Sequence, residues 1–347
     1  MSTSTIPPPL TRSPLWLVQG DYFEQARIAK ARVSAEYLQS DRRTSTILED
    51  TPNPYENVVG VGLGPRIIRG YTTGELCVKV YVRRKFPKSQ IKQGDLLPSG
   101  YDGIRLDVEE AGLLETFEAE LDDILPNPMV SLDPLQPGTS VGGCACSVGG
   151  TGTIAAIAAD RAGRRFALTC AHVIKSTCGH AEVFHPGVAD AAQDGTARLI
   201  GRVAHLAAAV PDAVNDIDAG SILLSVAADP KILYIGGPTD QTIATRGMLV
   251  HKFGRTSRYT YGLVTDPEFD VNLYSRRQGA WITYVNQIRI EPVGMQPFSA
   301  SGDSGALVLE AATNRAIGVL LGGGPPFSVA NHLFRVLEGL GLMLVTA

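Results

Sequence analysis

Hydrophobic positions along this chain recur with two different periods. Before residue 40 they recur every three or four residues, and Ser13 followed by Pro14 supplies an N-cap and a first-turn residue, so the pattern predicts one amphipathic helix. We expect its apolar face to pack on the chain's own domain, with docking to a partner as the alternative. The face contains Leu15, Val18, Tyr22, Ala26, Ala29, Val33 and Tyr37.

From residue 57 onward the period changes to that of short β-strands. Three segments alternate β-branched and polar residues between glycines, and with the helix they predict a small α+β module. The stretch after them is acidic and rich in proline, which is typical of a linker. The sequence therefore predicts a tail, helix and module over 1–112, a linker over 113–137 and a second domain over 138–347. The three segments are 58–64, 75–82 and 104–110.

The predicted second domain consists of short, closely spaced strands. Regular short strands separated by turns favour a β-barrel or sandwich pair over alternating βαβ units. Only residues 329–342 have a helical pattern. The expected strands are 151–159, 164–171, 218–226, 248–254, 259–265, 287–292, 305–310 and 316–323.

Composition narrows the class of protein. The 347 residues are 44% hydrophobic and 19% charged, which is typical of a soluble globular protein. The net charge of -4, without long basic runs, argues against nucleic acid as a partner. No apolar run approaches the roughly 18 residues of a membrane span, and the first residues lack a secretion-signal pattern, so we expect a cytoplasmic protein without a membrane partner. Five cysteines are too few for a disulfide scaffold, and we expect reduced thiols.

Three segments of the second domain carry residues suited to acyl transfer. FALTCAHVI places His172 just after a buried strand, NDIDAGSILL places Asp218 at the start of another, and SASGDSGALVL places Ser304 in a glycine turn. A serine hydroxyl attacks an amide or ester when an imidazole accepts its proton and later gives it to the leaving group. A carboxylate behind the imidazole fixes its tautomer. Asp212 and Asp216 lie close in sequence and could supply that carboxylate instead.

The order of these residues and the sequence around them resemble the bacterial branch of the chymotrypsin-like serine proteases. Segment 169–172, Thr-Cys-Ala-His, is similar to the family's Thr-Ala-Ala-His, and segment 302–305 matches its Gly-Asp-Ser-Gly. VHKFGRTSRYTYGLV (250–264) resembles the Gly-Arg-Thr-Thr-Gly segment of that branch. The resemblance covers about residues 138–347 and implies two six-stranded β-barrels with the active site between them. An α+β module before such a domain is also known from bacterial trypsin-like proteins.

The resemblance implies a role for each residue of these segments. Ser304 would be the nucleophile, His172 the general base and acid, and Asp218 the orienting carboxylate. The backbone N–H groups of Gly302 and Ser304 would form the oxyanion hole, because a tight turn free of Cβ clashes can direct both groups at one oxygen. In the family the counterpart of Asp303 can bind a newly cleaved N-terminus, but this chain offers no clear activation sequence, so Asp303 could have another partner.

The resemblance also implies where a peptide substrate binds. Strand 319–324 would pair with an extended peptide, because its glycines leave room for main-chain hydrogen bonds. Phe298 would form the base of the specificity pocket and offers no counter-charge for Arg or Lys, so we expect a small or apolar residue before the scissile bond. Ser299 or Ser301 could line the pocket instead. The residues expected to contact substrate are Phe298, Gly322, Gly323 and Gly324.

Other classes of site fit less well. An α/β-hydrolase would need Gly-x-Ser-x-Gly and the order Ser, Asp, His, whereas residue 306 is alanine and the order here is reversed. A zinc site is conceivable, but the cysteine spacing is not the usual C-x₂₋₄-C, so we expect no metal and no cofactor. The other histidines are interpreted as structural. The conceivable zinc ligands are Cys144, Cys146, Cys170, Cys178 and His180.

The sequence therefore predicts a serine endopeptidase that acts on protein or peptide substrates. Its N-terminal module could select substrate or receive a regulatory partner. Two alternatives stay open: a binding or scaffold protein with a protease fold and a closed cleft, and a processing enzyme that cleaves itself or one partner. For self-cleavage, the acidic and proline-rich stretch at 113–140 is the expected cut site.

Overall fold

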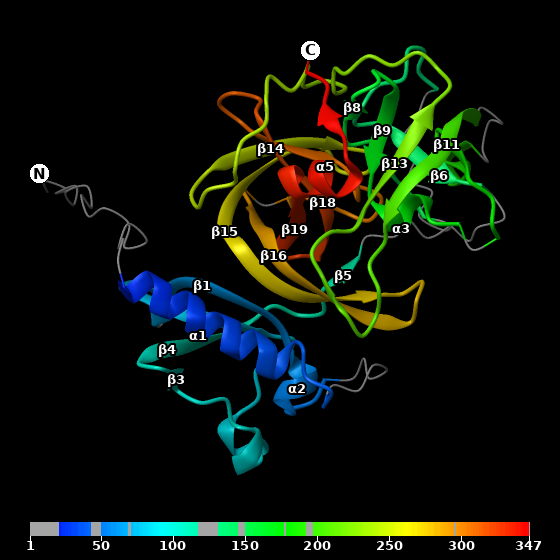
Figure 1. Cartoon of the computed structure of the whole chain (residues 1–347). Helices are drawn as coiled ribbons and strands as arrows, with labels where there is room; N and C mark the ends of the chain where they lie inside the picture. The colour runs from blue at the N-terminus through cyan, green and yellow to red at the C-terminus, as the bar shows by residue number, and fades with distance from the viewer. Residues whose placement is uncertain are drawn as a thin grey trace, which may run out of the picture.

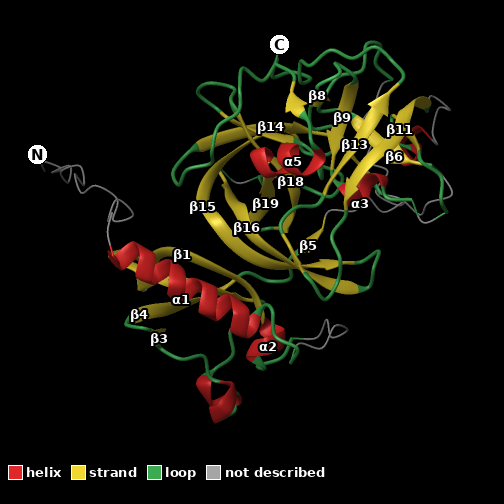
Figure 2. Ribbon diagram, in the orientation of Figure 1, coloured by secondary structure: helices red, strands yellow, loops and turns green. Residues whose placement is uncertain are grey.

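Strands dominate the computed structural model and form two curled sheets with few helices around them (Figure 1, Figure 2). The mainly β class and the two-barrel architecture expected from the sequence are confirmed. Within the described part of the chain, no helix has both the length and the apolar character to cross a membrane. The structure describes residues 21–42, 50–68, 71–116, 131–144, 150–176, 178–191, 197–294 and 296–346.

The N-terminal part is a helix laid across a small sheet (Figure 1). Its elements are α1 (Asp21–Tyr37), α2 (Pro54–Asn57), β1 (Val58–Ile68), β2 (Tyr71–Val82), the 3₁₀ turns η2 (Lys88–Gln90) and η3 (Gln93–Asp95), β3 (Gly100–Tyr101) and β4 (Ile104–Glu110). Helix α1 packs on β1 and β2 through Ala26, Ala29 and Val33, which are fully buried, so its apolar face packs on the chain itself as expected. The predicted start of this helix at Ser13 lies outside the described residues.

The N-terminal sheet continues into the second barrel. Strand β1 pairs antiparallel with β15 (Arg258–Ser275), so both belong to one 12-stranded sheet. A Cβ at Gly60 of β1 would lie 2.5 Å from the ring of Phe269, which explains a glycine inside this strand. Lys30 of α1 forms a buried ion pair with Asp270 of β15, with 2.7 Å between Nζ and Oδ1. The α+β module is therefore built onto the barrel at a shared strand edge.

The first barrel is an eight-stranded sheet with the order β20-β8-β9-β13-β11-β10-β6-β7. Its two end strands, β20 and β7, have only two and three residues and raise the count above the expected six. Short helices fill its connections. The elements are β6 (Ser140–Gly143), β7 (Thr151–Thr153), β8 (Ile157–Ala159), β9 (Arg165–Thr169), α3 (Ala171–Ile174), β10 (Glu182–His185), α4 (Val188–Ala191), β11 (Arg198–Ala207), β13 (Ala219–Leu224) and β20 (Met343–Leu344).

The second barrel closes as a ring of six strands. Its elements are β14 (Leu249–Gly254), β15, β16 (Ala280–Pro292), β17 (Leu307–Glu310), β18 (Ala316–Gly324), β19 (Phe327–His332) and the C-terminal α5 (Leu333–Leu340). The strand order is β16-β19-β18-β17-β14-β15, and pairing between β15 and β16 completes the ring. Strands β15 and β16 form a long hairpin that extends beyond the barrel, where β12 (Val214–Asn215) pairs with β16. This hairpin reaches the first barrel.

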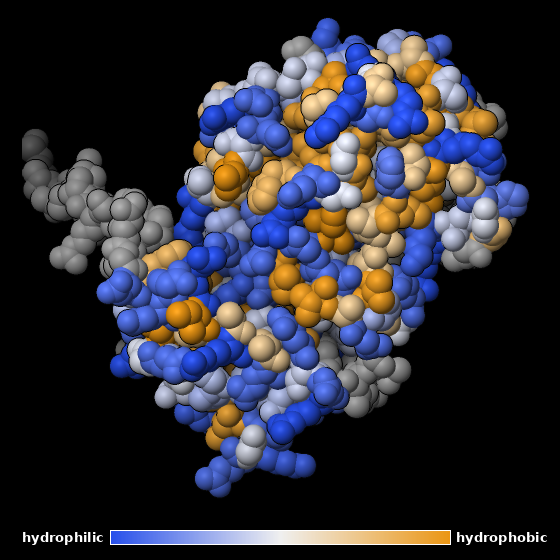
Figure 3. Space-filling view, in the orientation of Figure 1, coloured by the Kyte–Doolittle hydropathy of each residue, from blue (hydrophilic) through white to orange (hydrophobic). Residues whose placement is uncertain are grey.

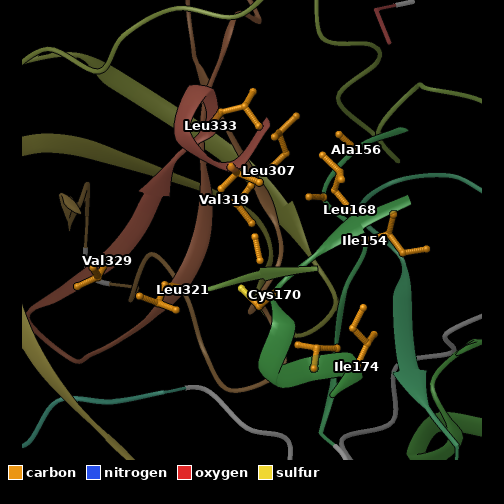
Figure 4. Close-up of a cluster of buried hydrophobic side chains, with 14 of the residues drawn as sticks. Ile154, Ala156, Leu168, Cys170, Ile174, Leu307, Val319, Leu321, Val329 and Leu333 are labelled. Carbon is orange, nitrogen blue, oxygen red and sulfur yellow. The ribbon is translucent and has the colours of Figure 1, made fainter. Parts of the chain in front are cut away.

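Hydrophobic side chains of both barrels meet in one buried cluster (Figure 4). Leu168 and Cys170 come from the first barrel, and Val319 and Leu321 come from β18 of the second. All four are 0% exposed and lie in the same core. Burial of each of these leucine and valine side chains contributes about 1.5–3 kcal/mol. The outer surface differs: Figure 3 shows hydrophobic residues on this face as small groups among hydrophilic ones. The cluster holds the two barrels together beside the candidate site.

Three sequence-based assignments change in the structure. The single strand expected over 151–159 is two strands, β7 and β8, separated by residues 154–156. The predicted helix over 329–342 is wrong in its first part, because those residues belong to β19, which is held between β16 and β18, and the helix begins only at Leu333. The stretch expected to be a linker contains a strand, β5 (Glu115–Thr116), that pairs with β15 and β18. Residues 117–130 of that stretch lie outside the described residues.

Candidate active site

His172 and Asp218 meet at one edge of the first barrel. His172 lies in α3, the single helical turn after β9, and Asp218 directly precedes β13, which pairs with β9. The Nδ1–H group of His172 donates a buried hydrogen bond to Oδ2 of Asp218, which makes Nε2 the basic ring atom. The backbone N–H of Asp218 donates to Oδ1 of Asn331 in β19, at 3.0 Å. The second barrel therefore helps to position the carboxylate.

Ser304 lies in the tight turn before β17. Gly302 and Gly305 have φ values of 94° and 95°, in the left-handed region that favours glycine. A Cβ at Gly305 would also lie 2.2 Å from the carbonyl oxygen of Thr153, so the turn packs directly on the first barrel. The Ser304 hydroxyl donates to the carbonyl oxygen of Leu321, at 3.0 Å. Its attack on a substrate would require this hydroxyl to rotate away from Leu321.

Cys170 joins the two halves of the site. Its sulfur lies within 4.8 Å of potential ligand atoms of His172 and Asp218, and it donates to the carbonyl oxygen of Leu320, at 3.1 Å. The same oxygen accepts the backbone N–H of Gly305, at 2.8 Å. Burial raises the pKa of the Cys170 thiol well above its usual range, so the sulfur is a neutral packing group and not a thiolate. One carbonyl of β18 thus connects the histidine loop to the serine turn.

A buried ion pair lies behind the serine turn. Lys252 and Asp303 are both 0% exposed, with 3.3 Å between Nζ and Oδ2. Asp303 also accepts hydrogen bonds from the backbone N–H groups of Thr256, Ser257 and Ala300, at 2.8, 3.1 and 2.9 Å. Burial lowers the pKa of Lys252, and the Asp303 carboxylate counteracts this. Asp303 therefore has an internal partner, which the sequence analysis left open without naming it. The signal for Lys252 was VHKFG, which places a lysine among apolar residues of a strand.

The residues expected to contact substrate lie in two places. Gly322 and Gly323 are in β18, whose one edge pairs with β19 and whose other edge pairs with β5. Phe298 is 1% exposed and belongs to the core of the second barrel, with 5.5 Å between its ring centroid and Nζ of Lys252. The hydroxyl of Ser299 forms a buried hydrogen bond to that of Ser328, at 2.6 Å. The region of the expected specificity pocket is therefore filled by the chain's own side chains.

The hairpin of β15 and β16 lines the cavity beside His172 and Asp218. At its tip, Arg277 donates to the carbonyl oxygens of His172 and Lys175, at 2.9 and 2.8 Å. The cavity beside His172 and Asp218 has a volume of about 10 Å³, enough for one water molecule at most. Ser304 is 0% exposed. With Ser304 buried and both edges of β18 paired beside it, a peptide substrate finds no free strand edge next to the hydroxyl in this structure.

Neither alternative carboxylate takes the place of Asp218, since Asp212 is exposed and Asp216 has another partner, and the other histidines also have other partners. Asp216 forms an ion pair with Arg335, at 2.6 Å, whereas the carboxylate bonded to His172 is that of Asp218. His185 is fully buried and bonded through both ring nitrogens, and burial lowers its pKa. The histidines interpreted as structural contact groups outside the site: His180 with Glu182, His185 with Ser140, His205 with Ser221, His251 with Tyr259 and His332 with Pro267.

The described cysteines do not support the alternative of a zinc site. Cys178 is disulfide-bonded, so the expectation of reduced thiols is wrong for this residue and its sulfur cannot act as a thiolate ligand. Cys146 lies outside the described residues. In the described part of the chain, the cluster with metal-ligating residue types is Cys170, His172 and Asp218, which is the site already described.

Comparison with known proteins finds similar solved structures. The chain is similar to a glutamic acid specific serine protease that uses a histidine triad in substrate binding, with 18% identity, a TM-score of 0.46, and coverage of 61% of this chain and 100% of that one. It is also similar to protease A of Thermobifida fusca, with 18% identity and a TM-score of 0.44, and to a chymotrypsin of Cellulomonas bogoriensis, with 19% identity and a TM-score of 0.40. Each of these matches covers 61% of this chain and 99% of the other one. No protein-family model matches the sequence, and no curated protein matches it.

Proposed function

We propose that this chain is a serine endopeptidase. The observation that carries the proposal is the buried pair of His172 and Asp218 from the first barrel, linked through one carbonyl of β18 to the glycine turn that holds Ser304. These three side chains supply a base, an orienting carboxylate and a nucleophile, which acyl transfer from an amide requires. The buried ion pair of Lys252 and Asp303 supports the turn without a newly cleaved N-terminus.

The proposed reaction has two halves. The Ser304 oxygen attacks the carbonyl carbon of the scissile peptide bond while its proton passes to Nε2 of His172, and the N–H groups of Gly302 and Ser304 bind the oxyanion. Protonated His172 then gives the proton to the departing amine as the C–N bond breaks, which leaves an ester on Ser304. A water molecule, deprotonated by His172, attacks the ester and releases the acid product. Asp218 stabilises the imidazolium in both halves.

The test is covalent labelling with a fluorophosphonate, which transfers its phosphonyl group to an activated serine oxygen and releases fluoride. We expect labelling of the wild type and none of Ser304→Ala, whereas Ser225→Ala, which removes an exposed serine elsewhere, labels like the wild type. Because the site is closed, labelling is measured before and after limited proteolysis. If neither sample is labelled, the chain is a scaffold protein with a protease fold and the proposal falls.

Self-processing is the second candidate function. It is favoured by β5, which belongs to the predicted linker and pairs with the strand expected to bind substrate. Purified wild type would then shift in gel mobility with time, and Ser304→Ala would not. An intact mass for both proteins after the same incubation would remove this candidate and leave the endopeptidase proposal standing.

A further inference from the structure

Strand β5 occupies a slot between β15 and β18. Its Glu115 pairs with Tyr274 of β15 in parallel and with Gly323 of β18 in antiparallel register. The residue before it, Leu114, is 0% exposed and belongs to the main hydrophobic core. The carbonyl oxygen of Leu114 accepts the backbone N–H of Tyr274, at 3.0 Å. The segment at 113–116 is therefore anchored by one buried side chain and by main-chain pairing on both sides.

The pairing lies directly beside the candidate nucleophile. Thr116 is opposite Gly322, and the preceding residue of β18, Leu321, carries the carbonyl oxygen that accepts the hydrogen bond from the Ser304 hydroxyl. An extended peptide that presents a bond to Ser304 would have to add to this same edge of β18. One strand edge has one set of N–H and C=O groups and accepts one partner strand. While β5 is in place, a substrate cannot pair there.

We propose that the segment at 113–116 is a tethered inhibitor of the site, so that the intact chain is latent and withdrawal of β5 activates it. This inference rests on the proposed endopeptidase function. The burial of Ser304 and the cavity of about 10 Å³ beside His172 agree with a closed state. A strand of two residues with one apolar anchor is among the elements that open most readily from a folded protein, so the block is reversible.

The experiment compares the fluorophosphonate labelling rate of the full chain in four forms. Leu114→Ala removes the apolar anchor of β5. Glu115→Pro removes an N–H group from the strand and disfavours pairing by a second, independent route. Leu76→Ala is the matched control, because this leucine is also buried, at 4% exposure, but lies in the separate N-terminal core away from β18. Circular dichroism verifies that each variant is folded.

We expect labelling of Leu114→Ala and of Glu115→Pro to be at least tenfold faster than that of the wild type, with Leu76→Ala within twofold of it. If the wild type is labelled as fast as both β5 variants, the inhibitor role is refuted while the endopeptidase function stands. An equal rise in Leu76→Ala would attribute the effect to general destabilisation and also refute it. If none of the four is labelled, even after limited proteolysis, the endopeptidase function falls and the inference falls with it.

Discussion

Removing the ion pair of Lys252 and Asp303 tests directly whether it positions the turn that carries Ser304. Replacement Lys252→Met keeps the approximate length of the side chain and leaves the Asp303 carboxylate buried without its ammonium partner. Breaking a fully buried pair from one side costs about 3–5 kcal/mol. Asp303 keeps three backbone N–H donors, so we expect the lower end, about 3 kcal/mol in the free energy of unfolding.

The same change should slow the chemistry. Asp303 directly precedes Ser304, and a displaced turn would misalign the N–H groups of the oxyanion hole. Loss of one such donor costs about 10²–10³ in rate. We therefore expect Lys252→Met to reduce fluorophosphonate labelling by about 10²-fold, measured in the Leu114→Ala background so that the site is open.

The control for this experiment is Lys79→Met. Lys79 is 3% exposed and forms an ion pair with Asp107, at 2.6 Å, in the N-terminal sheet. We expect it to lose stability in urea unfolding without a change in labelling. The double variant Lys252→Met with Asp303→Asn should regain part of the lost stability, because no unpaired buried charge remains. Normal labelling of Lys252→Met at its reduced stability would refute the positioning role.

Three other predictions follow from the site and its surroundings. In the Leu114→Ala background, where the site is open, Asp218→Asn should lower peptide hydrolysis by about 10⁴-fold, because an amide cannot hold His172 in the required tautomer; a loss below tenfold would contradict this role. Burial lowers the pKa of His185, so the contribution of its neutral ring to stability is complete above about pH 6.5 and is lost as the pH falls through the lowered pKa. In urea unfolding at about pH 7.5 and about pH 5, His185→Gln should therefore lose less free energy of unfolding at the lower pH than the wild type does. Elemental analysis of the purified protein should find zinc near zero, and one zinc per chain would restore the metal alternative.

Short motifs could be interpreted from the sequence because each is local. The segments around His172, Asp218 and Ser304 each place one side chain at the end of a strand, and the structure brings the first two into contact. The barrel class was also predictable, since it depends on many short strands and not on any one of them. The first part of the helix predicted over 329–342 is a strand, because its apolar pattern also suits a buried strand and the neighbouring strands decide between the two, whereas Leu333–Leu340 is helical.

The features that close the site could not be predicted in this way. Strand β5 is two residues long and is defined by its partners in β15 and β18, which lie far away along the chain. Arg277 and Lys252 acquire their positions from a long hairpin and from a barrel interior, respectively. A single sequence contains the residues for these contacts but not the register that brings them together.

The pairing between β1 of the N-terminal sheet and β15 of the second barrel also affects solubility. Where β1 pairs with β15, Gly60 lies opposite Val271 and Val61 opposite Asp270, and the neighbouring Phe269 is fully buried. A fragment that began at residue 138 would expose the backbone of β15 that pairs with β1, together with apolar side chains. An exposed strand edge of this kind pairs with strands of other molecules. The N-terminal sheet therefore protects the second barrel from aggregation, and a fragment without it would be soluble only if another surface covered that edge.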